Sequence, residues 1–318
     1  MPVLSLFVIF LVLALLATSL FFAVQSPECV TLTLGDSHGF AVSCDGTQPS
    51  IPRQVFLTTK DKATMRTWER KNIKKCKSVN PGWAFNLYND TEINDYVQER
   101  FPEMMDVWGF FRNSVEKTDF WRYLIVYDYG GLYMDTDIDC RRPIDELIVN
   151  KSIRGLVGLE NVQEGDDVVQ FAQYSFAFAP RHVVPLWTLK EIRNKVQAIK
   201  VSGSSDVYAL NLTGPIIWTS AILQYMSVFG MGKAATFQRG DHLVGDMQLL
   251  DINRFGAMKG RSIATRDCKH PDIYMIHQFA GSWVAKYRGY TDEQMADGGK
   301  QTRSSSRNNW RPRCADNR

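Results

Sequence analysis

Residues 113–146 read NSVEKTDFWRYLIVYDYGGLYMDTDIDCRRPIDE, and this stretch decides the fold. Its first half predicts a helix, because Asn113 can cap the first turn and Glu116 can complete a capping box. Gly130-Gly131 predict the end of that helix, since glycine adopts positive φ at little cost. Leu132–Met134 read as a short buried strand. The stretch therefore predicts a helix and a strand that lead into a run of acidic residues.

Three aspartates, Asp135, Asp137 and Asp139, occupy alternate positions after this strand. In an extended chain alternate residues point to one side, so the three carboxylates would share a face. Neighbouring carboxylates raise each other's pKa unless a cation neutralises them. Mg²⁺ and Mn²⁺ prefer oxygen ligands, commonly one or two carboxylates together with the phosphates of a substrate. The alternation therefore predicts a site for a metal-bridged diphosphate.

The acidic run fits neither an EF-hand nor a haloacid-type phosphatase. An EF-hand loop needs glycine where Cys140 stands, and Pro143 falls at another loop position. A haloacid-type phosphatase needs a small Thr or Val in place of Asp139. A solvated acidic turn remains the plain alternative for the D-x-D motif taken alone, because so short a motif has many false matches.

A longer pattern surrounds the motif, D-x-x-R-Y-x-x-x-x-x-x-G-G-x-Y-x-D-x-D. Its residues here are Asp119, Arg122, Tyr123, Gly130, Gly131, Tyr133, Asp135 and Asp137. This pattern resembles glycosyltransferase family 32, whose members are metal-dependent, retaining transferases of the GT-A type. Asp119 and Arg122 are three residues apart on a helix, so both can reach one sugar. A surface ion pair of little energetic value is the alternative for these two.

Two later segments extend the resemblance. Residues 170–180 and the segment from Thr213-Gly214-Pro215 to Trp218-Thr219 are similar to one subgroup, the fungal initiation-specific α-1,6-mannosyltransferases. Pro215 also suits the first turn of a helix, whose N-terminus can bind phosphate or sugar oxygens. His277 and Gly281-Ser282-Trp283 resemble the family's H-x-x-x-G-S-W. The alternative for His277 is a structural role at a strand end.

The resemblance implies a set of site residues. The catalytic residues it implies are Asp119, Arg122, Asp135 and Asp137. The donor-binding residues it implies are Asp119, Arg122, Tyr123, Gly131, Asp135, Thr213, Gly214, Ser282 and Trp283. The metal, Mn²⁺ or Mg²⁺, is expected on Asp137, Asp139 and His277. One segment departs from the family, because Phe56 and Thr59 stand where members carry His and Trp.

Alternation of strands and helices predicts the fold class. Four elements precede the central stretch and four strands and a helix follow it; they are Gln54–Thr58, 61–77, Trp83–Tyr88, Asp90–Phe101, Gly155–Glu160, Val168–Ala179, Val183–Gln197, Asp246–Leu250 and Tyr274–Ile276. This order is typical of an α/β protein with a mostly parallel central sheet, and the resemblance makes it GT-A-like. Ligands in such sheets bind at the carboxyl ends of strands, where Asp135 falls.

The chain divides into four parts. Residues 3–24 are uncharged and apolar, long enough to cross a bilayer, and predict one transmembrane signal-anchor, with a cleaved signal as the alternative. Residues 25–50 predict a stem and 51–290 the GT-A-like catalytic domain. Residues 291–318 predict a disordered basic tail.

Charge and cysteine content narrow the function. The chain carries a net charge of +3, and its last sixteen residues hold five arginines and one aspartate, which leaves −1 for the remainder. Such a body does not predict nucleic-acid binding. Six cysteines follow the apolar segment and could form three disulfides in any of fifteen pairings. We expect a single-pass type II protein of the Golgi or ER membrane with a lumenal catalytic domain.

The resemblance implies the activity. It implies a metal-dependent retaining transferase that moves a hexose, mannose from GDP-mannose, onto a glycan or glycolipid acceptor. Three alternatives remain: an inositol-phosphoceramide-type or UDP-sugar-dependent transferase, a catalytically inactive sugar-binding relative, and a hydrolase of nucleotide sugars.

Overall fold

The computed structural model describes residues 32–33, 39–40, 50–163, 168–203, 209–233, 236, 238–255, 264–265 and 267–280. The chain divides into two compact units, residues 1–48 and 49–318. In the first unit the described residues form a short antiparallel pair, β1 (Leu32–Thr33) and β2 (Gly39–Phe40). None of the helices among the described residues is long and apolar enough to cross a membrane. The expected anchor at 3–24 and the expected tail at 291–318 lie outside these ranges, as does most of the stem.

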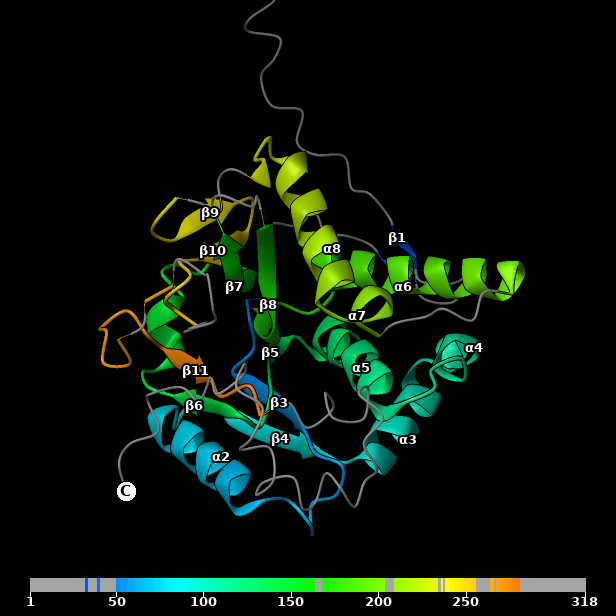
Figure 1. Ribbon diagram of the computed structural model, residues 1–318, viewed down its shortest axis with the longest axis horizontal. Helices are drawn as coiled ribbons and strands as arrows, with labels where there is room; N and C mark the ends of the chain where they lie inside the picture. Colours follow the sequence, from blue (N-terminus) through cyan, green and yellow to red (C-terminus); the bar gives the residue numbers. More distant parts are fainter. Residues whose placement is uncertain are drawn as a thin grey trace, which may run out of the picture. The chain divides into compact units, whose positions relative to one another are not determined.

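A seven-stranded sheet organises the second unit, in the order β4-β3-β5-β8-β7-β10-β9 (Figure 1). Its strands are β3 (Gln54–Thr58), β4 (Ala84–Tyr88), β5 (Gly131–Met134), β7 (Gly155–Gln163), β8 (Val168–Phe178), β9 (His242–Val244) and β10 (Met247–Leu250). The pairs β3–β4, β3–β5 and β7–β10 are parallel, whereas β5–β8, β7–β8 and β9–β10 are antiparallel. Five of the seven strands therefore share one direction, and the sheet is mixed but mostly parallel, as predicted.

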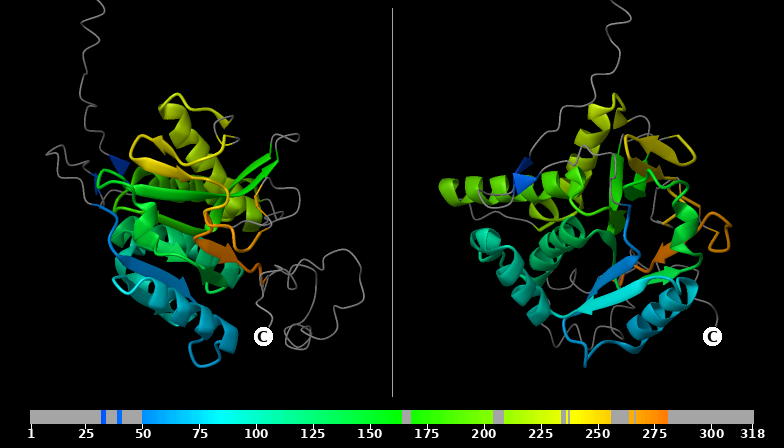
Figure 2. Two further views of the ribbon diagram at one scale, coloured as in Figure 1. Left: turned by 90° about the vertical axis from the view of Figure 1, so that its left-hand side faces the viewer. Right: turned by 180° about the vertical axis from the view of Figure 1, so that it is seen from behind.

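Helices pack in separate groups around this sheet. They are α2 (Thr67–Val79), α3 (Asp90–Arg100), α4 (Met105–Trp108), α5 (Ser114–Tyr129), α6 (Val183–Ser202), α7 (Ala209–Leu212) and α8 (Pro215–Val228), with the 3-10 turns Pro102–Met104 and Ile144–Leu147. Helices α5, α6 and α8 lie together, and α8 packs on β8 (Figures 1 and 2). Helix α2 lies apart from them, beside β6 (Ile138–Cys140).

Alternating side chains of the central strands build two sides of the core. Val55 of β3 and Leu132 of β5 belong to one buried cluster that includes Cys76 of α2. Phe56 and Tyr133, one position along each strand, instead meet aromatic rings of α5. The sheet is therefore buried on both faces, which explains the continuous apolar runs of these strands.

The ends of the helices follow their sequence signals. Asn113 caps α5, because its side chain accepts a hydrogen bond from the backbone N–H of Glu116 (2.9 Å). Glu116 accepts one from the N–H of Arg112 (2.8 Å). Gly130 ends α5 with φ of 66°. The first helix starts later than predicted, at Thr67, because Asp61 accepts a hydrogen bond from the N–H of Ala63 and holds that segment in a turn.

A second, two-stranded sheet joins segments far apart in the chain. Strand β6 pairs antiparallel with β11 (Met275–His277), and the register places His277 opposite Ile138. A disulfide between Cys76 and Cys140 ties β6 to α2. The pairing with β11 and the disulfide to α2 therefore fix the position of the segment that follows β5.

Candidate active site

A turn separates the three aspartates that were expected on one extended face. Strand β5 ends at Met134 and β6 begins at Ile138, whose N–H donates to the carbonyl of Asp135 (3.3 Å). The N–H of Asp135 in turn donates to the carbonyl of Tyr174 on β8 (2.9 Å). The prediction of one extended acidic face was wrong, because the chain turns at residues 136–137. The alternation of side chains along a strand does not continue through a turn.

Asp139 consequently lies away from the other two carboxylates. Its carboxylate is buried and pairs with Lys75 of α2 through one oxygen and with Arg141 through the other, at 2.6 Å. Both oxygens thus have a cationic partner already. The expected role of Asp139 as a metal ligand does not fit this geometry, and we assign it to holding α2 against β6.

Asp135, Asp137 and His277 form a group that could hold a metal ion. One ligand atom from each lies within 4.8 Å of the others. The Nε2 atom of His277 lies 3.1 Å from Oδ1 of Asp137. Neighbouring ligands in an octahedral shell of about 2.1 Å radius are about 3.0 Å apart. The donor set and its spacing therefore fit a hard divalent cation.

The two carboxylates differ in electrostatic surroundings. Burial raises the pKa of Asp135, and the charge of Asp137 adds to this, while Arg122 opposes both. Burial also acts to raise the pKa of Asp137, but His277 and the N–H of Ala280 (2.9 Å) lower it below the usual value. Asp137 is therefore the better anionic ligand of the pair.

Asp119 and Arg122 form a buried ion pair beside this group. Arg122 lies 2.9 Å from a carboxylate oxygen of Asp119 and 3.8 Å from one of Asp135. Its guanidinium covers the ring of Tyr133 at 4.5 Å. Burial raises the pKa of Asp119 to about 7, against the opposing charge of Arg122. Asp119 and Arg122 therefore contact each other as their spacing predicted, and Arg122 also lies near Asp135.

Thr213 joins the ion pair to α8. Its hydroxyl donates to Asp119 (3.2 Å), and its carbonyl accepts from the hydroxyl of Tyr123 (3.0 Å). Gly214 follows as the extended residue that precedes α8. Tyr123 is fully buried and stacks on Trp218 at 5.3 Å. The hydroxyl of Tyr123 therefore holds the Thr213 carbonyl in place.

Gln173 is a site residue without a role predicted from the sequence. Its carbonyl accepts from Arg122 (3.1 Å), and its side-chain amide donates to the hydroxyl of Tyr123 (2.6 Å) and the carbonyl of Thr213 (3.0 Å). The segment of β8 that contains it stands out in the sequence only through the subgroup resemblance. Gln173 could have been found only from the pairing of β8 with β5.

One other residue expected to bind the donor, Gly131, lies away from this group of side chains. Gly131 lies at the opposite end of β5 from Asp135, with φ of 107°, and a Cβ there would approach the carbonyl oxygen of Gln54 to 2.6 Å. Close packing of β5 against β3 therefore explains this glycine. Ser282 and Trp283 lie outside the described residues.

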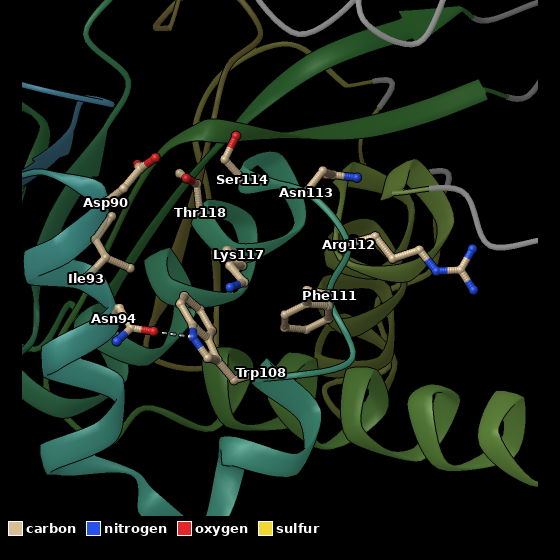
Figure 3. A pocket seen from close by; sticks show the side chains of 10 residues that line it. All are labelled: Asp90, Ile93, Asn94, Trp108, Phe111, Arg112, Asn113, Ser114, Lys117 and Thr118. Atoms are coloured by element: carbon tan, nitrogen blue, oxygen red, sulfur yellow. Dashed lines mark hydrogen bonds between the residues drawn. The ribbon is translucent and has the colours of Figure 1, made fainter.

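A pocket of about 250 Å³ opens at the N-terminus of α5 (Figure 3). Trp108 and Phe111 point into it, and Asn94 accepts a hydrogen bond from the indole N–H of Trp108 (3.1 Å). Its lining also includes Asp90, Ile93, Arg112, Asn113, Ser114, Lys117 and Thr118. Helix α5 thus lines this pocket with its first turns and carries the Asp119–Arg122 pair directly afterwards.

The chain is similar to known sugar transferases. Residues 67–153 match the family model described as the glycosyltransferase sugar-binding region containing the DXD motif. Inositol phosphoceramide mannosyltransferase 1 of Schizosaccharomyces pombe is 29% identical over 50% of this chain and 47% of its own length. The initiation-specific α-1,6-mannosyltransferases of S. pombe and Candida albicans are 27% and 25% identical, over 73% and 79% of this chain and 64% and 76% of theirs. The chain thus spans between about half and two thirds of the length of the first two.

Solved structures with some likeness are also glycosyltransferases. The PaToxG glycosyltransferase aligns with a TM-score of 0.42 and 14% identity, over 57% of this chain and 72% of its own. The galactosyltransferase LgtC aligns with a TM-score of 0.32 and 15% identity, over 51% and 71%. The family match rests instead on the sequence of the central stretch. The resemblance to the DXD-type glycosyltransferases is confirmed for this part of the chain, because residues 67–153 are similar to their sugar-binding region.

Proposed function

We propose that this protein is a metal-dependent, retaining glycosyltransferase that moves mannose from GDP-mannose to a glycan or glycolipid hydroxyl. The observation that carries this proposal is the position of the Asp119–Arg122 pair beside the Asp135–Asp137–His277 group, which puts sugar-binding and diphosphate-binding side chains next to each other. The names of the relatives support mannose as the sugar.

Charge explains why the reaction needs this arrangement. Departure of a nucleoside diphosphate builds negative charge on its leaving phosphate oxygen, and a cation held by Asp137 and His277, with Asp135 alongside, would stabilise that charge. Asp137 is kept ionised by its neighbours, and its second oxygen is fixed by the N–H of Ala280. Both features hold the ligand in place before the donor arrives.

Arg122 and Asp119 would bind the sugar. The Arg122 guanidinium is held by Asp119, by the carbonyl of Gln173 and by the face of Tyr133, so its orientation is set in advance. Such preorganisation lowers the reorganisation cost at the transition state. We assign no nucleophile and no general base, and a front-face retaining displacement is the mechanism that these residues suit.

The nucleoside would extend along α5 toward the pocket at its N-terminus. Ser114 and Arg122 are about 12 Å apart along the helix axis, at a rise of about 1.5 Å per residue. The pocket has a volume of about 250 Å³, which is below the range of pockets for whole drug-sized ligands and suits a single ring system. Trp108 and Phe111 line the pocket with aromatic rings, and Lys117 and Asn94 line it with polar groups.

The cellular setting is part of the proposal. We infer an N-terminal membrane anchor at residues 3–24, followed by a lumenal catalytic domain in the Golgi or ER. The Cys76–Cys140 disulfide supports an oxidising compartment. A neighbouring possibility is an inositol-phosphoceramide-type acceptor, which the name of one relative suggests.

Replacement of the proposed metal ligand tests the function directly. Asp137→Asn removes a charged ligand and keeps the side-chain shape, so Mn²⁺-dependent release of GDP from GDP-mannose should fall by at least about 10²-fold. Asp139→Asn is the matched control, because its carboxylate pairs with Lys75 and Arg141 instead. Near-normal turnover of Asp137→Asn, or an equal loss in Asp139→Asn, would contradict the assignment. Parallel assays with UDP-sugars would identify a different donor.

A further inference from the structure

The imidazole of His277 packs against two aromatic rings, which also contact each other at 6.1 Å between their centroids. The ring of Tyr174 is 4.1 Å from the imidazole centroid to centroid, at an interplanar angle of 30°, and the ring of Phe279 is 4.0 Å away at 47°. The imidazole side chain is 12% exposed. Its contacts with these two rings therefore define the plane in which the imidazole lies.

No described residue makes the hydrogen bond that usually orients a metal-binding histidine with the imidazole of His277. Such residues commonly donate their second ring N–H to a carboxylate, a carbonyl or a water molecule. The Nδ1 atom of His277 is buried and makes no hydrogen bond with any described residue. Among these residues, packing against the aromatic rings is therefore the interaction that can orient the imidazole.

The backbone of Phe279 is bent to allow this packing. Its φ is +46°, a strained left-handed conformation that is unusual outside glycine. The bend brings the Phe279 ring against His277 and lets the next N–H, that of Ala280, donate to Asp137 (2.9 Å). One strained residue therefore serves both proposed ligands of the metal.

We propose that Tyr174 and Phe279 are positioning residues that hold the imidazole of His277 in the orientation needed to share a divalent cation with Asp137. This inference rests on the proposed function, because it assumes that the cation binds at this group. It adds that the orienting interaction is an aromatic clamp and not a hydrogen bond. The clamp residues come from β8 and from the segment after β11.

The ring of Tyr174 matters in this proposal, and its hydroxyl does not. That hydroxyl is buried without a hydrogen-bond partner among the described residues. Removing an unpartnered buried hydroxyl leaves no partner unsatisfied, so Tyr174→Phe should keep the clamp. Tyr174→Leu keeps an apolar side chain but removes the flat ring, so it should release the imidazole.

The experiment measures binding of Mn²⁺ alone, without nucleotide, to the full chain by the loss of the free-ion electron paramagnetic resonance signal. Tyr174→Leu and Phe279→Leu should weaken Mn²⁺ affinity by about 10–100-fold, the usual effect of losing a residue that orients a ligand. Tyr174→Phe should bind as the unchanged protein does. His277→Ala marks the loss expected when the ligand itself is removed.

Phe178→Leu is the matched control. Phe178 lies on the same strand, is fully buried, and packs 4.5 Å from His182, a histidine outside the proposed metal group. It should lower the thermal unfolding temperature and leave Mn²⁺ affinity unchanged. The clamp is refuted if Tyr174→Leu binds Mn²⁺ normally, or if Tyr174→Phe loses as much affinity as Tyr174→Leu, while His277→Ala still loses binding. Absence of Mn²⁺ binding in the unchanged protein would overturn the proposed metal site together with the clamp.

Discussion

Helix α5 buries two aspartates that have different surroundings. Asp119 faces Arg122, Thr213 and the acidic turn, and its pKa is raised to about 7 by burial. Asp128, nearer the end of the same helix, pairs with Arg100 at 3.1 Å and Arg181 at 2.8 Å, away from the acidic turn. Only Asp119 and its partner Arg122 lie beside the group that could hold a metal ion. Substitutions of Asp119 and Asp128 can therefore separate an effect on the site from an effect on stability.

Substitutions in the Asp119–Arg122 pair should lower turnover more than nucleotide affinity. Asp119→Asn and Arg122→Lys should each reduce kcat strongly, because lysine lacks the planar fork of arginine and the hydrogen bonds to the sugar matter most as the glycosidic bond stretches. Calorimetry of GDP binding with Mn²⁺ should change little in either variant.

Asp128→Asn provides the control for stability. It weakens the ion pairs of a buried carboxylate with two partly exposed arginines, Arg100 and Arg181, so the free energy of unfolding should fall by about 1–3 kcal/mol. Its folded fraction should turn over at the normal rate. If GDP binding falls together with turnover in Asp119→Asn, the residue supports the fold or the nucleotide, and its sugar-binding role must be abandoned.

His182 makes the fold sensitive to acid. It is 2% exposed, its Nδ1 accepts from the N–H of Val184 (3.2 Å), and its Nε2 lies 3.1 Å from Asp246. Accepting that N–H requires an unprotonated Nδ1, so the folded state holds a neutral imidazole. Burial lowers the pKa of His182 accordingly. Below its unfolded pKa of about 6.5 the unfolded chain binds the extra proton, so stability is lost as pH falls.

His182→Asn should flatten the dependence of stability on pH. Asparagine can also cap a helix but does not titrate in this range. Between about pH 6.5 and pH 5 the free energy of unfolding of the unchanged protein should fall by up to about 1.4 kcal/mol per pH unit more than that of the variant. Urea titrations at pH 7, 6 and 5 measure this difference, and parallel curves for the two proteins would contradict it.

At the scale of elements, strand β6 depends on its link to α2. The Cys76–Cys140 disulfide closes a loop with a sequence separation of 64 residues, and Asp139 adds its ion pairs with Lys75 and Arg141. Between these anchors lies the turn that carries Asp135 and Asp137. The position of the carboxylates therefore depends on contacts made by the residues around them.

Removing the disulfide should destabilise the domain and loosen this turn. We expect the double variant Cys76→Ala with Cys140→Ala to lose about 2–5 kcal/mol of unfolding free energy, because the unfolded chain is no longer constrained. Urea unfolding with and without reductant measures this loss. The reductant should lower the free energy of unfolding of the double variant less than that of the unchanged protein. An unchanged unfolding midpoint in the variant would contradict the expectation.

At the scale of the whole molecule, the proposed anchor remains a prediction from sequence. If residues 3–24 span a bilayer, the full chain should stay in the membrane pellet after an alkaline carbonate wash, because a spanning helix is not released by loss of charge contacts. Protease should leave the body intact in sealed microsomes and digest it once detergent is added. Recovery of a soluble, secreted form that starts near residue 26 would indicate a cleaved signal instead.

Much of the fold was predictable because its signals are local. The cap at Asn113, the glycine stop at Gly130 and the alternation of helices and strands depend on residues a few positions apart, and α5, β5 and their neighbours formed where expected. The i, i+3 spacing of Asp119 and Arg122 likewise predicted their contact. The start of α2 was misplaced, because the turn that Asp61 makes competes with helix formation.

The sequence by itself determined which residue types the site contains, and the tertiary structure decided which of them meet. Asp139 shares the D-x-D-x-D pattern, yet the turn after Asp135 directs it to Lys75 and Arg141. His277 reaches Asp137 only because β11 pairs with β6 in one register. Gln173 is placed by the pairing of β8 with β5. Such pairings form between distant segments and depend on the packing of the whole domain, so no local pattern specifies them.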